Sequence, residues 1–183
     1  MSNKSVVIAL AQINARVGDV EFNRDLIIES ARRAQQEMNA DVVLFPELAL
    51  TGYPPEDLLF RPQFIAQTEA AVADLIAQNP GLCMVVGSVH AVDDALYNCA
   101  LVIRPQQPVV IYSKQKLPNY GVFDECRYFS PGDEALVFNY RGIYFGVTIC
   151  EDIWYPQPMA MACADGAQVV LNLNASPYHQ SKI

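Results

Sequence analysis

The sequence predicts an α/β fold in which helices are layered on mixed β-sheets. Strand–helix–strand patterns occur near both ends of the chain, and the strands between them form two hairpin patterns. Hydrophobic residues make up 52% of the 183 residues and charged residues 17%, which is typical of a folded domain. This length is enough for one domain with a substantial core. No internal repeat or low-complexity segment interrupts the chain.

In the first half of the chain, apolar strands alternate with helical patterns. Strands are expected at residues 6–11, 41–45 and 82–87, because each is a short run rich in Val, Leu or Ile. Apolar residues at helical spacing predict helices over residues 23–39 and 62–78. We expect Asn23 to begin the first of these helices and Pro46 to end the second strand.

The second half of the chain predicts two hairpins, one helix and a last strand. The expected strands are 96–104 with 109–113, 134–140 with 142–149, and 167–173. A helix over residues 158–165 ends at Gly166, a residue type that favours helix C-termini. Residues 117–132 form a long loop with several aromatic side chains, and loops of that length are usually functional.

Composition excludes several classes of function. The net charge of −8 argues against a nucleic-acid partner, and no segment has the apolar length of a membrane helix. The N-terminus lacks an apolar signal core, so we expect a cytoplasmic protein. Five cysteines without a C-x-x-C pair indicate neither a disulfide framework nor a zinc site. We therefore expect no metal in this domain.

Three predicted strands end in residues that could react together: Glu47, Lys114 and Cys150. Sites in α/β folds gather where strands end, so these side chains could meet. Cys150 would attack a carbonyl carbon, and Glu47 would move the proton from the thiol to the leaving group. Lys114 and the backbone N–H of Glu151 would stabilise the tetrahedral oxygen.

A cation beside Cys150 would favour the thiolate. A free thiol has a pKa near 8.5, and a cation about 4 Å away contributes on the order of 4 kcal/mol at a dielectric of about 20. That energy corresponds to roughly three pKa units in favour of the thiolate. From the residues alone, other interpretations stay open: Cys150 as a core residue, Glu47 as a solvated acid, and Lys116 in the role of Lys114.

Four motifs resemble the nitrilase superfamily, and specifically the N-terminal glutaminase domains of glutamine-dependent NAD⁺ synthetases. The motifs are FPELALTGY at 45–53, KQKLPNYGVFDE at 114–125, ICEDIW at 149–154 and NASP at 174–177. The resemblance implies an α-β-β-α sandwich of two mixed sheets. It also implies that Glu47, Lys114 and Cys150 are the catalytic triad, hydrolysing glutamine to glutamate and ammonia.

The resemblance implies roles for further residues by position. Glu125 matches a second glutamate that supports the lysine. A cation at position 182 would suit the α-carboxylate of glutamine. The residues matched to contacts with glutamine or its pocket are Tyr53, Tyr120, Glu151, Ser176 and Lys182.

The family's enzymes continue into a synthetase domain that uses ATP and Mg²⁺ to amidate nicotinic acid adenine dinucleotide. We find no phosphate-binding motif in this sequence, so we expect residues 1–183 to be an incomplete glutaminase domain without its synthetase domain. No cofactor is expected for the hydrolysis. An uncovered sheet edge would favour a homo-oligomer. The alternatives are a free-standing amidase acting on another small amide, and an inactive fragment or assembly module.

Overall fold

The computed structural model describes residues 5–176 and Gln180, and it contains two mixed sheets. The first sheet has five strands in chain order: β1 (Ile8–Leu10), β2 (Val42–Leu44), β3 (Cys83–Val92), β4 (Ala95–Ile103) and β5 (Val110–Ser113). The second sheet has three strands: β6 (Leu136–Tyr140), β7 (Ile143–Ile149) and β8 (Val169–Leu173). Both predicted hairpins, β4–β5 and β6–β7, are confirmed.

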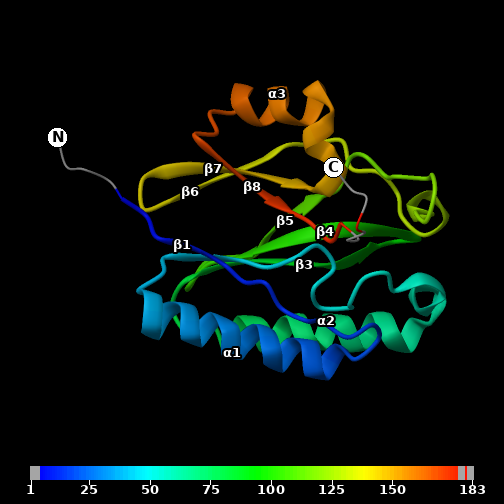
Figure 1. The fold of residues 1–183 in the computed structure, drawn as a ribbon, viewed down its shortest axis with the longest axis horizontal. Helices are drawn as coiled ribbons and strands as arrows, with labels where there is room; N and C mark the ends of the chain where they lie inside the picture. Colours follow the sequence, from blue (N-terminus) through cyan, green and yellow to red (C-terminus); the bar gives the residue numbers. More distant parts are fainter. Residues whose placement is uncertain (1–4, 177–179, 181–183) are drawn as a thin grey trace.

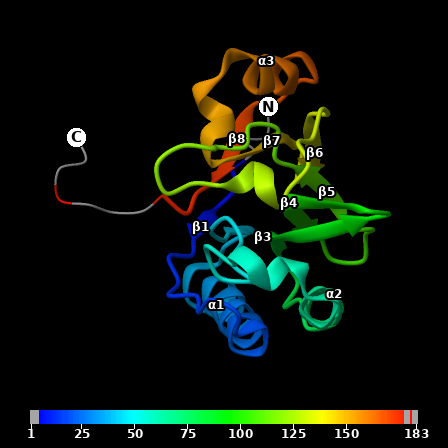
Figure 2. The ribbon, with the colours of Figure 1, turned by 90° about the vertical axis from the view of Figure 1, so that its right-hand side faces the viewer.

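Helices cover the outer faces of the two sheets. Helices α1 (Val20–Met38) and α2 (Pro62–Ala77) lie side by side under the five-stranded sheet, and α3 (Pro156–Ala164) lies above the three-stranded one (Figures 1 and 2). The layers therefore follow the order α-β-β-α, as the resemblance implied. Across the part of the chain that is described, no helix has the length and apolarity needed to span a bilayer.

The directions of the strands bring two of the predicted site residues to one edge. Strands β1, β2 and β3 are parallel, β4 is antiparallel to β3, and β5 is antiparallel to β4. Strands β2 and β5 consequently run the same way, so their carboxyl ends lie at the same edge of the sheet. The beginning of β4 lies at that edge too.

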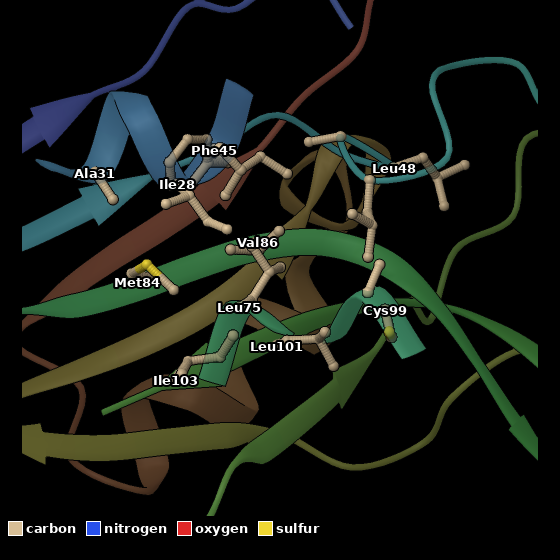
Figure 3. Close-up of a cluster of buried hydrophobic side chains, with 14 of the residues drawn as sticks. Ile28, Ala31, Phe45, Leu48, Leu75, Met84, Val86, Cys99, Leu101 and Ile103 are labelled. Carbon is tan, nitrogen blue, oxygen red and sulfur yellow. The ribbon is translucent and has the colours of Figure 1, made fainter. Parts of the chain in front are cut away.

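One apolar cluster fills the space between the five-stranded sheet and its two helices. Helix α1 contributes side chains at helical spacing, including Ile27 and Ala31, and α2 contributes Leu75. Figure 3 shows these helices facing side chains of β3 and β4 such as Met84 and Leu101. Burial of one side of each helix explains the helical spacing of the apolar residues.

A second apolar cluster lies between the two sheets. Buried side chains of β5 and of the β6–β7 hairpin meet there, and the rings of Phe138 and Phe145 stack with centroids 5.5 Å apart. The two faces of β7 differ only at its start, where Phe145 is fully buried while Tyr144 is 47% exposed; the rest of the strand is buried. This cluster fixes the position of the second sheet relative to the first.

The first helix begins earlier than the sequence pattern predicted. It starts at Val20, and the side chain of Asp19 caps it by accepting a hydrogen bond from the backbone N–H of Phe22. Asn23 is buried inside the first turn. Its side-chain oxygen accepts a hydrogen bond from the backbone N–H of Arg16, and its side-chain NH₂ group donates to the carbonyl oxygens of Arg16 and Leu50. Asn23 therefore anchors a loop instead of capping the helix.

The third strand is longer than predicted. It continues through Ser88 and His90 to Val92, where a tight turn through Asp93 joins it to β4 in a third hairpin. Because polar residues follow Gly87, the sequence pattern predicted that the strand ends there. Ser88 is nevertheless buried and His90 faces Tyr97 across the ladder, so the sheet continues past the purely apolar segment.

Candidate active site

Glu47 and Lys114 meet at the edge where β2 and β5 end. Glu47 is three residues beyond β2 and 1% exposed, and Lys114 follows β5 directly with no exposed surface. Their side chains form an ion pair with 2.6 Å between Lys114 Nζ and Glu47 Oε1. The prediction that these two strand ends converge is confirmed, and Lys114, not Lys116, is the lysine at this point.

Glu125 forms a second ion pair with the same lysine. Both of its carboxylate oxygens lie 2.8 Å from Lys114 Nζ. Glu125 begins a short 3₁₀ helix, Glu125–Arg127, inside the long loop that we predicted to be functional. It is 5% exposed, so one ammonium group is shared by two buried carboxylates.

Burial controls the charges of this cluster. Burial, followed by the charge of Glu47, raises the pKa of Glu125 to about 7, although Lys114 lowers it in part. Burial opposes the charge on Lys114, but the attraction of Glu47 and Glu125 outweighs it and raises the pKa of the lysine. Two carboxylates and one ammonium leave an excess negative charge, which a proton on Glu125 would neutralise.

Cys150 lies where β7 ends, in a strained backbone conformation. It begins the 3₁₀ helix Cys150–Trp154 and has φ 47°, in the left-handed region that non-glycine residues rarely adopt. Such residues are found disproportionately at functional sites. Its side chain is half-buried, and the charges of Glu47, Lys114 and Glu125 all act on the thiol.

The expected thiolate is not the resting form of Cys150. Burial, followed by the charge of Glu47, raises the pKa of the thiol to about 11, while Lys114 and a hydrogen bond from Ser176 lower it only in part. Lys114 does not fully offset these effects, because two carboxylates within 2.8 Å already neutralise its charge. Cys150 is consequently protonated near neutral pH.

Two polar residues of this region escaped the sequence analysis. Asn98 of β4 is buried, and its side-chain N–H donates to Glu47 Oε1 at 2.8 Å and to Glu125 Oε2 at 3.5 Å. Asp152 is buried two residues after the cysteine and accepts four hydrogen bonds. Asn98 is a polar residue within a strand that is otherwise largely apolar, and Asp152 is one of two acids that directly follow Cys150; these are the signals by which the sequence could have revealed them.

Three of the residues matched to glutamine contacts, Tyr53, Tyr120 and Ser176, lie close enough to Cys150 to interact electrostatically with it. The charge of Cys150 raises the pKa of Tyr53 and of Tyr120, after the larger effects of burial and of a hydrogen bond to Glu151, respectively. The hydroxyl of Tyr120 donates to the buried Glu151 at 2.8 Å. The side chain of Ser176 forms a hydrogen bond to the thiol of Cys150. Lys182, also matched to glutamine, lies outside the described residues.

Two cavities open beside the cluster. One, of about 300 Å³, is lined by residues of two loops that include Tyr53, Phe123 and Glu125, so it borders the ion pairs. The other, of about 420 Å³, is lined by Lys116, Leu117, Glu151 and Tyr155. Cys150 lines neither cavity and is only half-buried. Within residues 5–176 and 180, no group of three or more His, Cys, Asp or Glu side chains could hold a metal ion.

A half-buried cysteine beside a buried Glu–Lys–Glu cluster on an α-β-β-α sandwich defines a class of hydrolase. The model of the carbon-nitrogen hydrolase family matches residues 7–183, and the chain belongs to this family. It is 47% identical, over 96% of its length, to the glutamine-dependent NAD⁺ synthetase of Xanthomonas campestris pv. campestris. The chain spans about a third of the length of the curated relatives it matches.

Solved structures give the same assignment. The glutamine-dependent NAD⁺ synthetase of Acinetobacter baumannii, described in complex with ADP, superposes with a TM-score of 0.90 at 41% identity, covering 95% of this chain and 33% of that one. An amidase of Nesterenkonia sp. AN1 superposes with a TM-score of 0.86 at 29% identity, covering 97% and 69%. A variant of that amidase, which is a member of the nitrilase superfamily, is described with acrylamide added at its active-site cysteine.

Proposed function

We propose that this chain hydrolyses the side-chain amide of glutamine to glutamate and ammonia, with Cys150, Glu47 and Lys114 as the catalytic residues. The observation that carries the proposal is the single buried ammonium group shared by two carboxylates beside a half-buried cysteine. The 47% identity to a glutamine-dependent NAD⁺ synthetase supports glutamine as the substrate.

The first half of the reaction forms a thioester. Because the thiol is protonated, its attack on the amide carbon is coupled to transfer of its proton to Glu47. Glu47 then gives that proton to the leaving nitrogen, so that the C–N bond breaks and ammonia departs. Glu125 supports this step by holding the Lys114 side chain in place from the other side.

The second half hydrolyses the thioester. Glu47 takes a proton from water as the oxygen attacks the carbonyl carbon, the C–S bond breaks, and the proton returns to the sulfur of Cys150. Glutamate leaves with the new oxygen atom. In both halves, Lys114 Nζ and the backbone N–H of Glu151 donate to the negatively charged tetrahedral oxygen.

The substrate-binding residues follow from their position around the thiol. Tyr53, Tyr120 and Ser176 would contact the glutamine side chain or its polar end groups, since each interacts with Cys150. Lys182 would pair with the α-carboxylate, as a carboxylate in a partly buried site requires a counter-charge.

We propose that the ammonia serves a synthetase domain of the same polypeptide, which amidates nicotinic acid adenine dinucleotide to NAD⁺. The identity of this chain to one third of several glutamine-dependent NAD⁺ synthetases supports this assignment. ATP and Mg²⁺ would act in that synthetase domain, and the amide hydrolysis itself needs no cofactor.

Release of glutamate from glutamine by the 183-residue chain tests the hydrolysis. The wild-type chain should release glutamate, and Cys150→Ala should abolish the release because no nucleophile remains. Cys163→Ala is the matched control, since Cys163 is an exposed thiol of α3. An electrophilic glutamine analogue should add to Cys150 in a mass-spectrometric peptide map. Labelling at another cysteine instead would contradict the proposal.

A complete synthetase that contains this chain tests the division of labour. The C150A form should lose glutamine-dependent NAD⁺ synthesis and keep the ammonia-dependent reaction, because the two reactions use separate domains. Loss of both activities in a folded C150A enzyme would refute the assignment of ammonia transfer.

A free-standing amidase is the second candidate. The observation that favours it is the TM-score of 0.86 to the Nesterenkonia amidase, of which the chain covers 69%. Comparing turnover of glutamine with that of simple amides such as acetamide separates the two candidates. Faster turnover of acetamide would favour the amidase.

A further inference from the structure

Asp152 is a buried carboxylate that the catalytic scheme does not use. It has no exposed surface, and within the described residues it forms no ion pair. Its pKa is raised, because burial outweighs the hydrogen bonds that it accepts. Burial of a carboxylate without an ion-pair partner costs free energy. The hydrogen bonds of Asp152 must therefore make a contribution to the structure that a neutral side chain would not make.

The hydrogen bonds of Asp152 join the two strand ends that carry Lys114 and Cys150. Oδ1 accepts the backbone N–H groups of Gln115 at 3.1 Å and Lys116 at 2.8 Å, immediately after Lys114. Oδ2 accepts the backbone N–H of Ile149 at 3.0 Å, immediately before Cys150. One carboxylate thus connects the ends of β5 and β7, which belong to different sheets.

The fourth bond strengthens this link from the first sheet. The hydroxyl of the buried Tyr112, on β5, donates to Oδ2 at 2.8 Å. Each of the two carboxylate oxygens therefore accepts two hydrogen bonds. An asparagine has the same shape but only one acceptor oxygen, and its NH₂ group would face N–H donors.

We propose that Asp152 is a positioning residue, which sets the place and backbone conformation of Cys150 relative to Lys114. Strained conformations persist only where the surrounding structure holds them, and Cys150 has φ 47°. The bond to the N–H of Ile149 holds the residue just before it, while the bonds to Gln115 and Lys116 hold the segment after the lysine. This inference rests on the proposed function, because it concerns the same nucleophile.

Asp152→Asn tests the proposal, with Asp41→Asn as the matched control. Asp41 is a buried aspartate just before β2, on the opposite edge from Glu47; it accepts a backbone N–H from Val7 and also forms an ion pair with Arg141. D152N should lower kcat for glutamine about 100-fold, since small misplacements of reacting groups have effects of that size. KM should change little, because substrate contacts remain. D41N should keep wild-type kcat.

Alkylation of the cysteines by iodoacetamide gives a readout that does not depend on turnover. In D152N the turn should relax, so Cys150 should react faster and its alkylation should titrate well below the wild-type pKa of about 11. The buried Cys83 and Cys99 report on global unfolding in the same peptide map. They should stay unlabelled in D152N.

The outcomes separate this inference from the proposed function. If D152N and D41N had the same kcat and the same Cys150 alkylation, the positioning role would be overturned. Labelling of Cys83 and Cys99 in D152N would also overturn it, because Asp152 would then contribute to overall stability instead. If the wild-type chain released no glutamate, the proposed function would fail. The alkylation of Cys150 would still decide whether Asp152 sets its position.

Discussion

Lys114 is the shared counter-charge of two carboxylates that lie in the interior of the protein. Removing one partner from a buried ion pair leaves an uncompensated charge, which is more destabilising than the pair is stabilising. Lys114→Met should therefore lower the free energy of unfolding by about 3–5 kcal/mol, measured by urea denaturation near neutral pH. The loss should shrink at low pH, where Glu125, whose pKa is raised, becomes protonated.

Lys116→Met is the matched control for this substitution. Lys116 lies two residues further along, and its ammonium contacts Gln157 on the exposed surface. Its removal should change the free energy of unfolding by less than about 0.5 kcal/mol. Equal effects of K114M and K116M would contradict the assignment of the buried cluster to Lys114.

Glu125 links protein stability to pH. Its pKa is raised from the ordinary 4.5 to about 7 by burial and by Glu47, so the folded protein holds a proton that the unfolded chain releases in this range. Between pH 4.5 and about 7 the unfolded state binds fewer protons than the folded state, so the free energy of unfolding falls as the pH rises through this range. Glu125→Gln should flatten that fall in urea titrations across the same range, whereas E134Q, at an exposed glutamate, should leave it unchanged.

At the scale of single residues, the sequence predicted the reacting groups but not their charge states. Glu47, Lys114 and Cys150 each follow an apolar strand, a position visible in the sequence. The protonated thiol was not predictable, because it depends first on the burial of Cys150 and then on the charge of Glu47, which the fold brings close to it. Asn98 also escaped prediction, since its bond to Glu47 spans 51 positions of the chain.

Strand β3 holds the loop that carries Glu47. The backbone N–H of Phe45 bonds the carbonyl of Val85, and that of Leu50 bonds the carbonyl of Gly87, so both flanks of Glu47 are attached to β3. A methyl group on Gly87 would overlap with the backbone of Pro46 and Leu48. The absence of a side chain at Gly87 is therefore what allows Glu47 to lie against the sheet.

Gly87→Ala tests this close approach. The added methyl group should lower the free energy of unfolding by about 1–3 kcal/mol, as overpacking usually does, and should slow glutamate release by displacing Glu47. Gly146→Ala is a milder insertion, since its methyl would meet only side-chain carbon atoms, the nearest being Ala167 Cβ at 3.0 Å. Full activity in G87A would show that the Glu47 loop is not held by this contact.

Most elements, but not all of their boundaries, followed from sequence periodicity. The helices and both expected hairpins are present because one face of each is buried. Several boundaries differ by one or two residues, and two differ by three or more. Asp19 and Asn23 are both plausible caps, and only the loop around Arg16 decides that the second is buried. Strand β3 extends through Ser88 because β4 pairs with it.

At the scale of the whole molecule, the site lies at the junction of the two sheets. Glu47 and Lys114 follow strands of the first sheet, and Cys150 follows β7 of the second. The apolar cluster between the sheets keeps these groups together. Phe145 is at its centre, fully buried and stacked on Phe138.

Phe145→Ala should therefore lower the free energy of unfolding by about 3–5 kcal/mol, since it removes a large side chain from a closed core. Tyr144→Ala, at the preceding residue of the same strand, should have an effect below about 1 kcal/mol because that side chain faces outward. Thermal or urea unfolding of both variants measures the difference. Similar values for the two would contradict the placement of Phe145 in the core and of Tyr144 at the surface.

Some expectations for the whole molecule remain predictions. The cytoplasmic location and the homo-oligomer were inferred from composition and from the expected sheet edge. Sedimentation of the purified chain over a range of concentrations would test the second. The ammonia-using synthetase domain also remains part of the proposal.

By itself the sequence determined most of the strand and helix pattern and the family, and it predicted Glu47, Lys114 and Cys150 as candidate reacting residues, because periodicity and short motifs are local properties of the chain. The tertiary structure alone decided that Lys114 is shared by two carboxylates, that Cys150 rests as a thiol, and that Asn98 and Asp152 hydrogen-bond to the segments around the candidate site. The physical reason is that burial and partners set a group's charge state, and the partners come from distant segments that only the fold brings together.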